Sequence, residues 1–188
     1  MSDRVIVFAT SFLDELITHP PEEHEGRRIL ETLEAETGVR IDYRCERDPA
    51  EPLTADELEG AVAVVADLEH YDGELLSKVG HGAGGKLGLI SRYGIGYDSV
   101  DTEAATQNGV VVSNTPGANA RPTAEWAVAT LLDIAGRRIP HYRSASQGKP
   151  KQGPSRLDLS GQTLGVVGTG NIGKQVVSLL KGFDMNVI

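Results

Sequence analysis

The stretch from residue 164 to residue 173 constrains the possible fold more than any other part of the sequence. It begins with an apolar run rich in valine and continues with Gly168, Gly170 and Gly173 in the spacing G-x-G-x-x-G. Residues 174–181 then have apolar positions at helical periodicity. A strand, a glycine-rich turn and a helix in this order predict a dinucleotide-binding turn, and the alternative is a chance glycine pattern in a loop.

Each of the three glycines has a physical role in such a turn. Gly168 permits the tight turn, Gly170 lets the backbone approach a pyrophosphate, and Gly173 lets the helix pack closely against the strand. The N-terminus of the helix adds unpaired N–H groups and the positive end of the helix dipole, both of which favour a phosphate.

The sequence ends before this nucleotide-binding unit would be complete. The acidic residue that binds the ribose hydroxyls is expected about 20 residues further on, at the end of a second strand. That strand only begins at Met185, and Asp184 precedes it, so NAD and NADP are not distinguished. The strand would be an uncovered edge without helices on both faces of the sheet. We expect Ile188 to be a truncation point and the 188-residue chain alone to be aggregation-prone or molten.

The preceding residues alternate between apolar strand-like runs and amphipathic helical segments. Runs at residues 5–9 and 61–66 read as buried strands, and those at 87–90 and 110–114 read as further strands. Residues 39–43 alternate between apolar and polar side chains as a strand should. Asp72 and Asp101 are expected helix N-caps, and Thr54 with Glu57 forms a capping box before a short helix. Residues 140–159 read as a polar connector. This spacing predicts an α/β fold with right-handed crossovers and a parallel sheet, and residues up to about Asp101 suffice for a small domain.

Charge and composition exclude several classes of function. The formal net charge is −9, which argues against a nucleic-acid or acidic-membrane partner. Cys45 is the single cysteine, so neither a disulfide framework nor a cysteine-based metal site is expected. No apolar run approaches the length of a membrane span, and the N-terminus lacks the apolar core of a signal peptide. We expect a cytoplasmic protein.

A second glycine-containing segment, residues 91–101, directly follows one of the predicted strands. Gly94 and Gly96 free the backbone where open α/β sheets bind ligands, at the carboxyl end of a strand. Backbone N–H groups there could hold a carboxylate. An ordinary strand–helix turn, with Asp98 or Asp101 as its cap, explains the same pattern equally well.

Four motifs in order resemble the D-isomer-specific 2-hydroxyacid dehydrogenases. They are residues 93–101 (YGIGYDSVD), residues 114–117 (NTPG), residues 123–125 (TAE) and the glycine turn at Gly168. The resemblance covers residues 87–188 well and the first 80 residues in outline. It implies a flavodoxin-like substrate domain, residues 1–101, and an incomplete Rossmann domain that binds NAD or NADP, residues 102–188. It further implies an active site in the cleft between the domains, and a homodimer to which the helix of Trp126 contributes.

The resemblance also implies roles for individual residues. The amides of Ile95 and Gly96 would hold the substrate carboxylate, and those of Asn171 and Ile172 would contact the cofactor pyrophosphate. Thr123 would line the cofactor pocket. Asn119 would face the reacting centre, although a helix N-cap before Pro122 explains it equally well.

Two departures from the family limit what can be carried over. Its catalytic Arg, Glu and His follow the second strand of the dinucleotide domain, so no catalytic residue and no metal ligand is expected in this chain, and the 188 residues alone should be inactive. Asp67 and Glu69 stand where many members have a small or basic residue near the substrate. Two acids there would repel an anionic substrate, so the specificity of phosphoglycerate dehydrogenase cannot be assumed.

The leading hypothesis is an NAD(P)-dependent oxidoreductase, phosphoglycerate dehydrogenase-like, that transfers a hydride between nicotinamide and C2 of a small D-2-hydroxy or 2-oxo acid. The alternative is an NAD(H)-binding regulator, resembling the corepressors that share this fold, without turnover. A third hypothesis is a flavodoxin-like fold that binds no nucleotide. Which acid is used stays open at this point.

Overall fold

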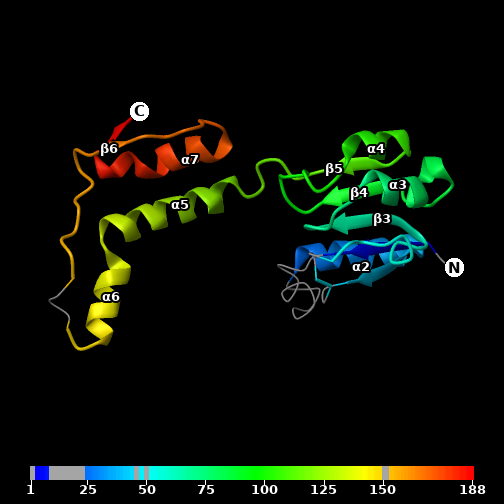
Figure 1. Ribbon diagram of the computed structural model, residues 1–188, viewed down its shortest axis with the longest axis horizontal. Coiled ribbons are helices and arrows are strands. Elements are labelled where there is room, and N and C mark those ends of the chain that lie inside the picture. Colours follow the sequence, from blue (N-terminus) through cyan, green and yellow to red (C-terminus); the bar gives the residue numbers. More distant parts are fainter. Residues whose placement is uncertain (1–2, 9–23, 45–46, 49–50, 150–152) are drawn as a thin grey trace. The chain divides into compact units, whose positions relative to one another are not determined.

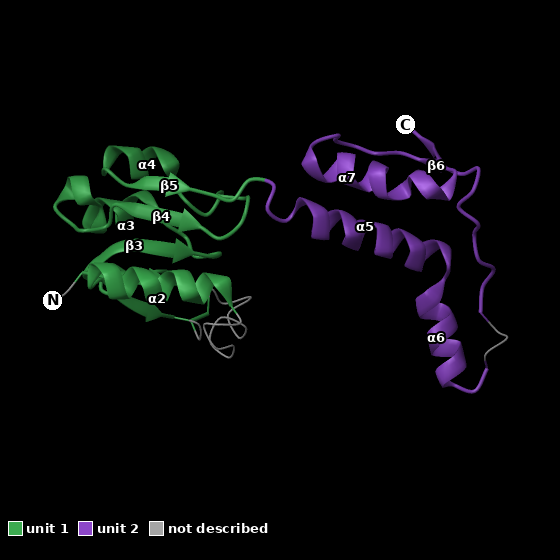
Figure 2. Cartoon of the chain, turned by 180° about the vertical axis from the view of Figure 1, so that it is seen from behind, with its two compact units in different colours: residues 1–116 green, residues 117–188 purple. Residues whose placement is uncertain are grey.

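The computed structural model describes residues 3–8, 24–44, 47–48, 51–149 and 153–188. The chain divides into two compact units, Met1–Pro116 and Gly117–Ile188, shown in different colours in Figure 2. Cys45 lies outside the described residues, as does Ala9 at the end of the first expected strand. The assignment of a substrate domain and a dinucleotide domain stays a prediction.

The first unit is built on a parallel sheet, which has five strands within the described residues, in the order β2-β1-β3-β4-β5. The strands are β1 (Arg4–Val7), β2 (Arg40–Tyr43), β3 (Ala61–Ala66), β4 (Leu89–Arg92) and β5 (Val111–Ser113). Val5 of β1 lies opposite Ile41, and Val64 of β3 lies opposite Ile90. This strand order is that of flavodoxin-like folds, so the expected parallel α/β architecture is confirmed.

Side chains from the two faces of the sheet enter different apolar clusters. Ile6 and Phe8 join the larger core with residues of α3 (Gly73–Val79) and α4 (Thr102–Gln107). Val7 instead packs with Leu30 of α2 (Glu25–Thr37). The alternation follows from the two-residue period of a strand, which sends successive side chains to opposite faces. The short 3₁₀ helix η1 (His81–Ala83) follows α3.

The expected capping residues make the expected hydrogen bonds. Asp72 Oδ1 accepts from the Leu75 N–H at 2.8 Å, and Asp101 Oδ1 accepts from the Ala104 N–H at 2.9 Å. In the capping box, the Thr54 N–H donates to Glu57 at 2.8 Å. The box does not begin a regular helix, however, because residues 55–60 form successive turns. Gly60, at a φ of 76°, ends this segment directly before β3, so there is no room for more than a turn or two.

The second unit consists of helices and one short pair of strands. Its helices are α5 (Ala120–Ala135), α6 (Arg138–Ser146), α7 (Asn171–Leu179) and the 3₁₀ helix η2 (Leu180–Phe183). Strands β6 (Thr163–Leu164) and β7 (Asn186–Val187) pair in parallel. Helices α5 and α7 lie side by side (Figure 1). The predicted order of strand, glycine turn, helix and second strand is therefore present.

Part of the expected connector at residues 140–159 is helical. Helix α6 runs from Arg138 to Ser146 and contains Pro140 as its third residue. A proline is tolerated there because the first-turn N–H groups of a helix have no intrahelical partner. The polar composition of this segment predicted a connector, whereas its first part is a helix whose first turn contains a proline.

Candidate functional site

The loop that follows β4 is held in place through its carbonyl groups. Gly94 has a φ of 145°, a conformation that favours glycine. Its carbonyl oxygen accepts from the Thr115 N–H at 3.0 Å, and the carbonyl oxygen of Ile95 accepts from Asn114 Nδ2 at 2.8 Å. The segment after β5 thus fixes the loop after β4, which joins two of the motifs singled out in the sequence.

Two adjacent N–H groups of the same loop lack hydrogen-bond partners among the described residues. Within the described residues, neither the Ile95 N–H nor the Gly96 N–H donates a hydrogen bond, and Gly96 is exposed. Two adjacent free donors on a backbone with fixed carbonyls can bind an anion. A carboxylate, with two acceptor oxygens, suits such a pair of donors.

Three charged side chains are buried at the carboxyl ends of β3 and β4, next to this loop. Arg92 is 7% exposed, Asp67 4% and Glu69 0%. Arg92 Nη1 donates to the Tyr93 carbonyl at 2.7 Å and lies 3.6 Å from Asp67 Oδ1. Glu69 Oε2 accepts from the Asp67 N–H at 2.9 Å. A Cβ atom on Gly94 would lie 3.5 Å from Arg92 Nη1, so the guanidinium group rests against the loop.

Buried polar atoms without partners also occur beside this cluster. Among the described residues, Glu69 Oε1, Arg92 Nε and the Tyr71 hydroxyl are buried and have no hydrogen-bond partner. Burial raises the pKa of Tyr71 well above its ordinary value of 10.0, and the Glu69 carboxylate adds to the shift, so the phenol stays protonated. Neither Arg92 nor Tyr71 was predicted from the sequence as a site residue. The signal for Arg92 was its position between an apolar strand and the glycine loop.

The second unit contains the glycine turn expected to bind a nucleotide. Gly168 has a φ of 92°, and a Cβ on Gly173 would overlap the Gly168 carbonyl oxygen. A Cβ on Gly170, in contrast, would meet nothing within 4 Å. Helix α7 begins at Asn171 without a side-chain cap, so the N–H groups of Asn171 and Ile172 point out of the helix end without intrahelical partners. Space and free donors are thus both present at this helix end.

The start of α5 lies next to the start of α7. A Cβ on Gly117 would lie 3.5 Å from Asn171 Nδ2. Asn119 occupies the N-cap position of α5, but its side chain makes no capping hydrogen bond and is exposed. Thr123, one turn later, is partly exposed. The second unit therefore brings the two segments expected to contact the cofactor to one place, while Ile95 and Gly96 belong to the first unit.

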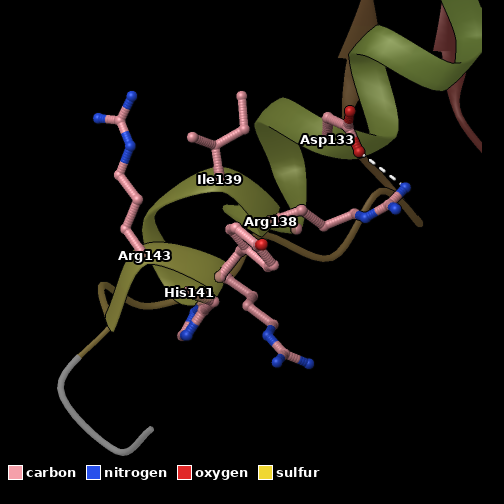
Figure 3. Close-up of a pocket in the computed structure, with 8 residues that line it drawn as sticks. Asp133, Arg138, Ile139, His141 and Arg143 are labelled. Atoms are coloured by element: carbon pink, nitrogen blue, oxygen red, sulfur yellow. Dashed lines mark ion pairs between the residues drawn. The ribbon is translucent and has the colours of Figure 1, made fainter. Parts of the chain in front are cut away.

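A separate pocket of about 670 Å³ lies on α5 and α6, and none of the expected site residues lines it (Figure 3). Arg138 Nη1 forms an ion pair with Asp133 Oδ1 at 2.8 Å at one side of this pocket. His141 Nε2 lies 3.0 Å from the Pro154 carbonyl oxygen. His141 therefore ties the segment after α6 to that helix.

Two classes of site find no support in the described part of the chain. None of its His, Cys, Asp and Glu side chains form a group of three or more that could hold a metal ion. None of its helices is both long and apolar enough to cross a membrane.

A parallel sheet in flavodoxin-like order, followed by a strand, glycine turn and helix, defines a two-part Rossmann-like α/β protein. The family model of the D-isomer specific 2-hydroxyacid dehydrogenase catalytic domain matches residues 16–177. The chain belongs to this family.

Relatives and solved structures agree with the family. The D-3-phosphoglycerate dehydrogenase of Archaeoglobus fulgidus is 43% identical over 127 residues, which are 66% of this chain and 23% of that protein. The glyoxylate reductase of Thermococcus litoralis is 38% identical over 140 residues, 70% of this chain and 40% of that protein.

Among solved structures, the TT0316 protein from Thermus thermophilus has a TM-score of 0.75 and 31% identity, over 98% of this chain and 54% of that one. The NAD⁺-bound 3-phosphoglycerate dehydrogenase of Entamoeba histolytica has a TM-score of 0.70 and 26% identity, over 99% of this chain and 53% of that one. The chain thus spans about half the length of these solved structures and less than half the length of the two curated relatives.

Proposed function

We propose that this chain is part of an NAD(P)-dependent oxidoreductase that transfers a hydride between nicotinamide and C2 of a small D-2-hydroxy or 2-oxo acid. The observation that carries the proposal is the pair of free N–H groups at Ile95 and Gly96, in a loop whose carbonyl groups are already bonded. These two donors hold the substrate carboxylate, which fixes C2 relative to the loop.

The second unit holds the dinucleotide. The N–H groups of Asn171 and Ile172 at the start of α7 bind the pyrophosphate, and Gly168, Gly170 and Gly173 give it room. Thr123 lines the pocket. The NAD⁺ bound to the 26% identical Entamoeba histolytica enzyme supports NAD as the cofactor. When bound, the nicotinamide supplies the hydride chemistry, and the protein supplies binding and orientation.

Asn119 positions the reacting part of the substrate. Its side-chain amide is exposed and is not used to cap α5, so it can donate to a substrate oxygen. Acid–base catalysis is assigned to none of these 188 residues. By resemblance to the family, the catalytic Arg, Glu and His follow the second strand of the dinucleotide domain.

The proposal is tested with the native-length protein and two variants of Gly96. Gly96→Pro removes the N–H donor, whereas Gly96→Ala keeps it, and the nearest atom to the added Cβ would be Asp98 Oδ2 at 3.8 Å. NADH oxidation is followed with a panel of 2-oxo acids that includes glyoxylate and hydroxypyruvate. Loss of one hydrogen bond to a carboxylate should raise KM about tenfold or more in Gly96→Pro relative to Gly96→Ala. The Kd for NADH should stay the same in both.

Three outcomes would contradict the proposal. Equal KM values for the two Gly96 variants would mean that this N–H does not bind the substrate. NADH binding without turnover of any acid in the panel would favour the regulatory alternative. Binding of neither NADH nor NADPH would favour a fold without nucleotide.

A further inference from the structure

The charges next to the carboxylate-binding loop are unbalanced. Asp67 and Glu69 are buried there, and Arg92 is the single cation that the described residues place against them. Asp98 adds a carboxylate at the other side of the loop, since its Oδ2 would lie 3.8 Å from a Cβ on Gly96. The nearby Arg47 is paired with Glu57 at 2.9 Å and adds no net charge.

Arg92 is too buried to reach a second anion: its Nε lies in the interior, unpartnered among the described residues, and only its Nη1 makes hydrogen bonds with them. Its Nη1 donates to the carbonyls of Tyr93 and Ala66, at 2.7 and 3.3 Å, and its side chain is 8% exposed. Turning the guanidinium toward a ligand would break these bonds and separate Arg92 from Asp67. Removing one partner of a buried ion pair costs several times more folding free energy than an exposed ion pair contributes.

The acidic charges also act without effective screening. Glu69 is fully buried, and its Oε1 has no hydrogen-bond partner among the described residues. Salt and water screen such a charge far less than they screen a surface carboxylate. Its field therefore reaches a ligand bound at the adjacent loop.

We infer that the substrate is a small unphosphorylated 2-hydroxy or 2-oxo monoacid, and that Asp67, Glu69 and Arg92 determine this preference. The inference rests on the proposed function. Two free N–H groups compensate one carboxylate, but a phosphate ester adds close to two further negative charges at neutral pH. The buried carboxylates repel these charges, and the two nearby arginines, Arg47 and Arg92, are already bonded. A single carboxylate on a short carbon chain is the ligand that this loop can hold.

The test compares two acids that differ only in a phosphate group. The native-length protein is assayed with hydroxypyruvate and with 3-phosphohydroxypyruvate at low ionic strength. We expect kcat/KM to be about tenfold or more higher for hydroxypyruvate, from two charges repelled over less than a Debye length.

Two variants assign the preference to the carboxylates. Glu69→Gln keeps an oxygen that accepts from the Asp67 N–H and removes the charge, and Asp98→Asn removes an exposed charge without touching the core. Each should shift the kcat/KM ratio toward the phosphorylated acid by about two- to tenfold. Glu59→Gln is the matched control, because Glu59 is exposed just before the opposite end of β3, and its ratio should equal that of the wild type.

The outcomes separate this inference from the proposed function. A wild-type protein that prefers 3-phosphohydroxypyruvate overturns the inference and leaves the proposed function intact. The same holds if both Glu69→Gln and Asp98→Asn leave the ratio unchanged. Absence of turnover with every 2-oxo acid tested overturns the proposed function and this inference together.

Discussion

Tyr71 is a fully buried phenol that makes no hydrogen bond within the described residues. A buried hydroxyl without a partner lowers stability, because it has lost its bonds to water. We predict that Tyr71→Phe leaves the free energy of unfolding unchanged or raises it by up to about 1 kcal/mol, measured by urea denaturation at neutral pH. Tyr97→Phe, at an exposed tyrosine, is the control and should have no effect. A loss of stability in Tyr71→Phe would show that the hydroxyl is bonded through water.

The raised pKa of Tyr71 gives the same substitution a pH dependence. The folded protein keeps the phenol protonated at a pH where the unfolded chain, with a pKa near 10.0, has lost the proton. Stability from this group is therefore complete below the unfolded pKa and falls as the pH rises above it. Unfolding midpoints should decrease more steeply above that pH in the wild type than in Tyr71→Phe, and parallel curves would contradict the assignment.

Gly170 and Gly173 differ in the space that an added side chain would have. A Cβ on Gly173 would overlap the backbone oxygen of Gly168, whereas one on Gly170 would meet open space. We predict that Gly173→Ala destabilises the protein by about 1–3 kcal/mol, as overpacking does. Gly170→Ala should instead keep the wild-type melting temperature and weaken NADH binding, because the added methyl group occupies the place of the pyrophosphate. Thermal melts and NADH titrations distinguish the two, and a full-affinity Gly170→Ala would contradict the site.

At the scale of one element, the capping box before β3 stabilises the fold in a pH-dependent way. Partial burial acts to raise the pKa of Glu57, but hydrogen bonds from Arg47 and Thr54 outweigh it, and the pKa lies below its ordinary value of 4.5. A lowered pKa means that the contribution is present above the unfolded pKa and is lost as the pH falls through the folded one. Glu57→Gln should cost about 0.5–1 kcal/mol at neutral pH.

The measurement is urea denaturation between neutral pH and the acid range. The difference between wild type and Glu57→Gln should shrink as the pH falls below the ordinary carboxyl pKa. Glu59→Gln, an exposed neighbour with no capping role, should follow the wild type. A constant difference at all pH values would mean that the charge of Glu57 is not what stabilises the box.

Local signals in the sequence predicted the helices and strands better than they predicted the contacts between them. Asp72 and Asp101 cap the expected helices because a cap depends only on the next three residues. The helix around Pro140 was missed because its sequence lacks amphipathic periodicity and a recognisable cap. Such a helix depends on its surroundings rather than on its own pattern.

In the candidate site, too, contacts between segments could not be predicted from the sequence. The sequence identified the glycine loop and the Asn114 motif separately, but their hydrogen bond depends on β4 and β5 being neighbours. The resemblance to the family also predicted that Asp67 and Glu69 lie near the substrate, which stays a prediction. That Arg92 is buried against Asp67 follows from the pairing of β3 with β4, which residue spacing does not reveal.

At the scale of the whole chain, charge is divided unequally between the two units. The first unit, Met1–Pro116, has 23 acidic side chains and nine basic ones, and the second has four acidic and nine basic. Self-repulsion of the acidic unit opposes its folding, and salt screens that repulsion. We predict that about 1 M NaCl raises the melting temperature by roughly 2–4 °C, equivalent to about 1 kcal/mol. A melting temperature that falls with added NaCl would contradict a role for this repulsion.

Large apolar side chains on α5 and α6 are exposed to solvent. Trp126, Tyr142 and Ile134 are 76%, 75% and 62% exposed, and the pocket of Figure 3 lies on the same two helices. Monomeric proteins rarely expose several such groups together, and buried aromatic side chains dominate the stability of interfaces.

We therefore predict that the native-length protein is a homodimer and that Trp126→Ala raises its dissociation constant about tenfold or more. Measuring the molar mass by light scattering over a dilution series gives this dissociation constant. Ile29→Ala, at a similarly exposed apolar residue on α2, is the matched control and should keep the wild-type mass. A wild-type protein of monomer mass at every concentration, or equal dissociation of the two variants, would mean that α5 and α6 are not the interface.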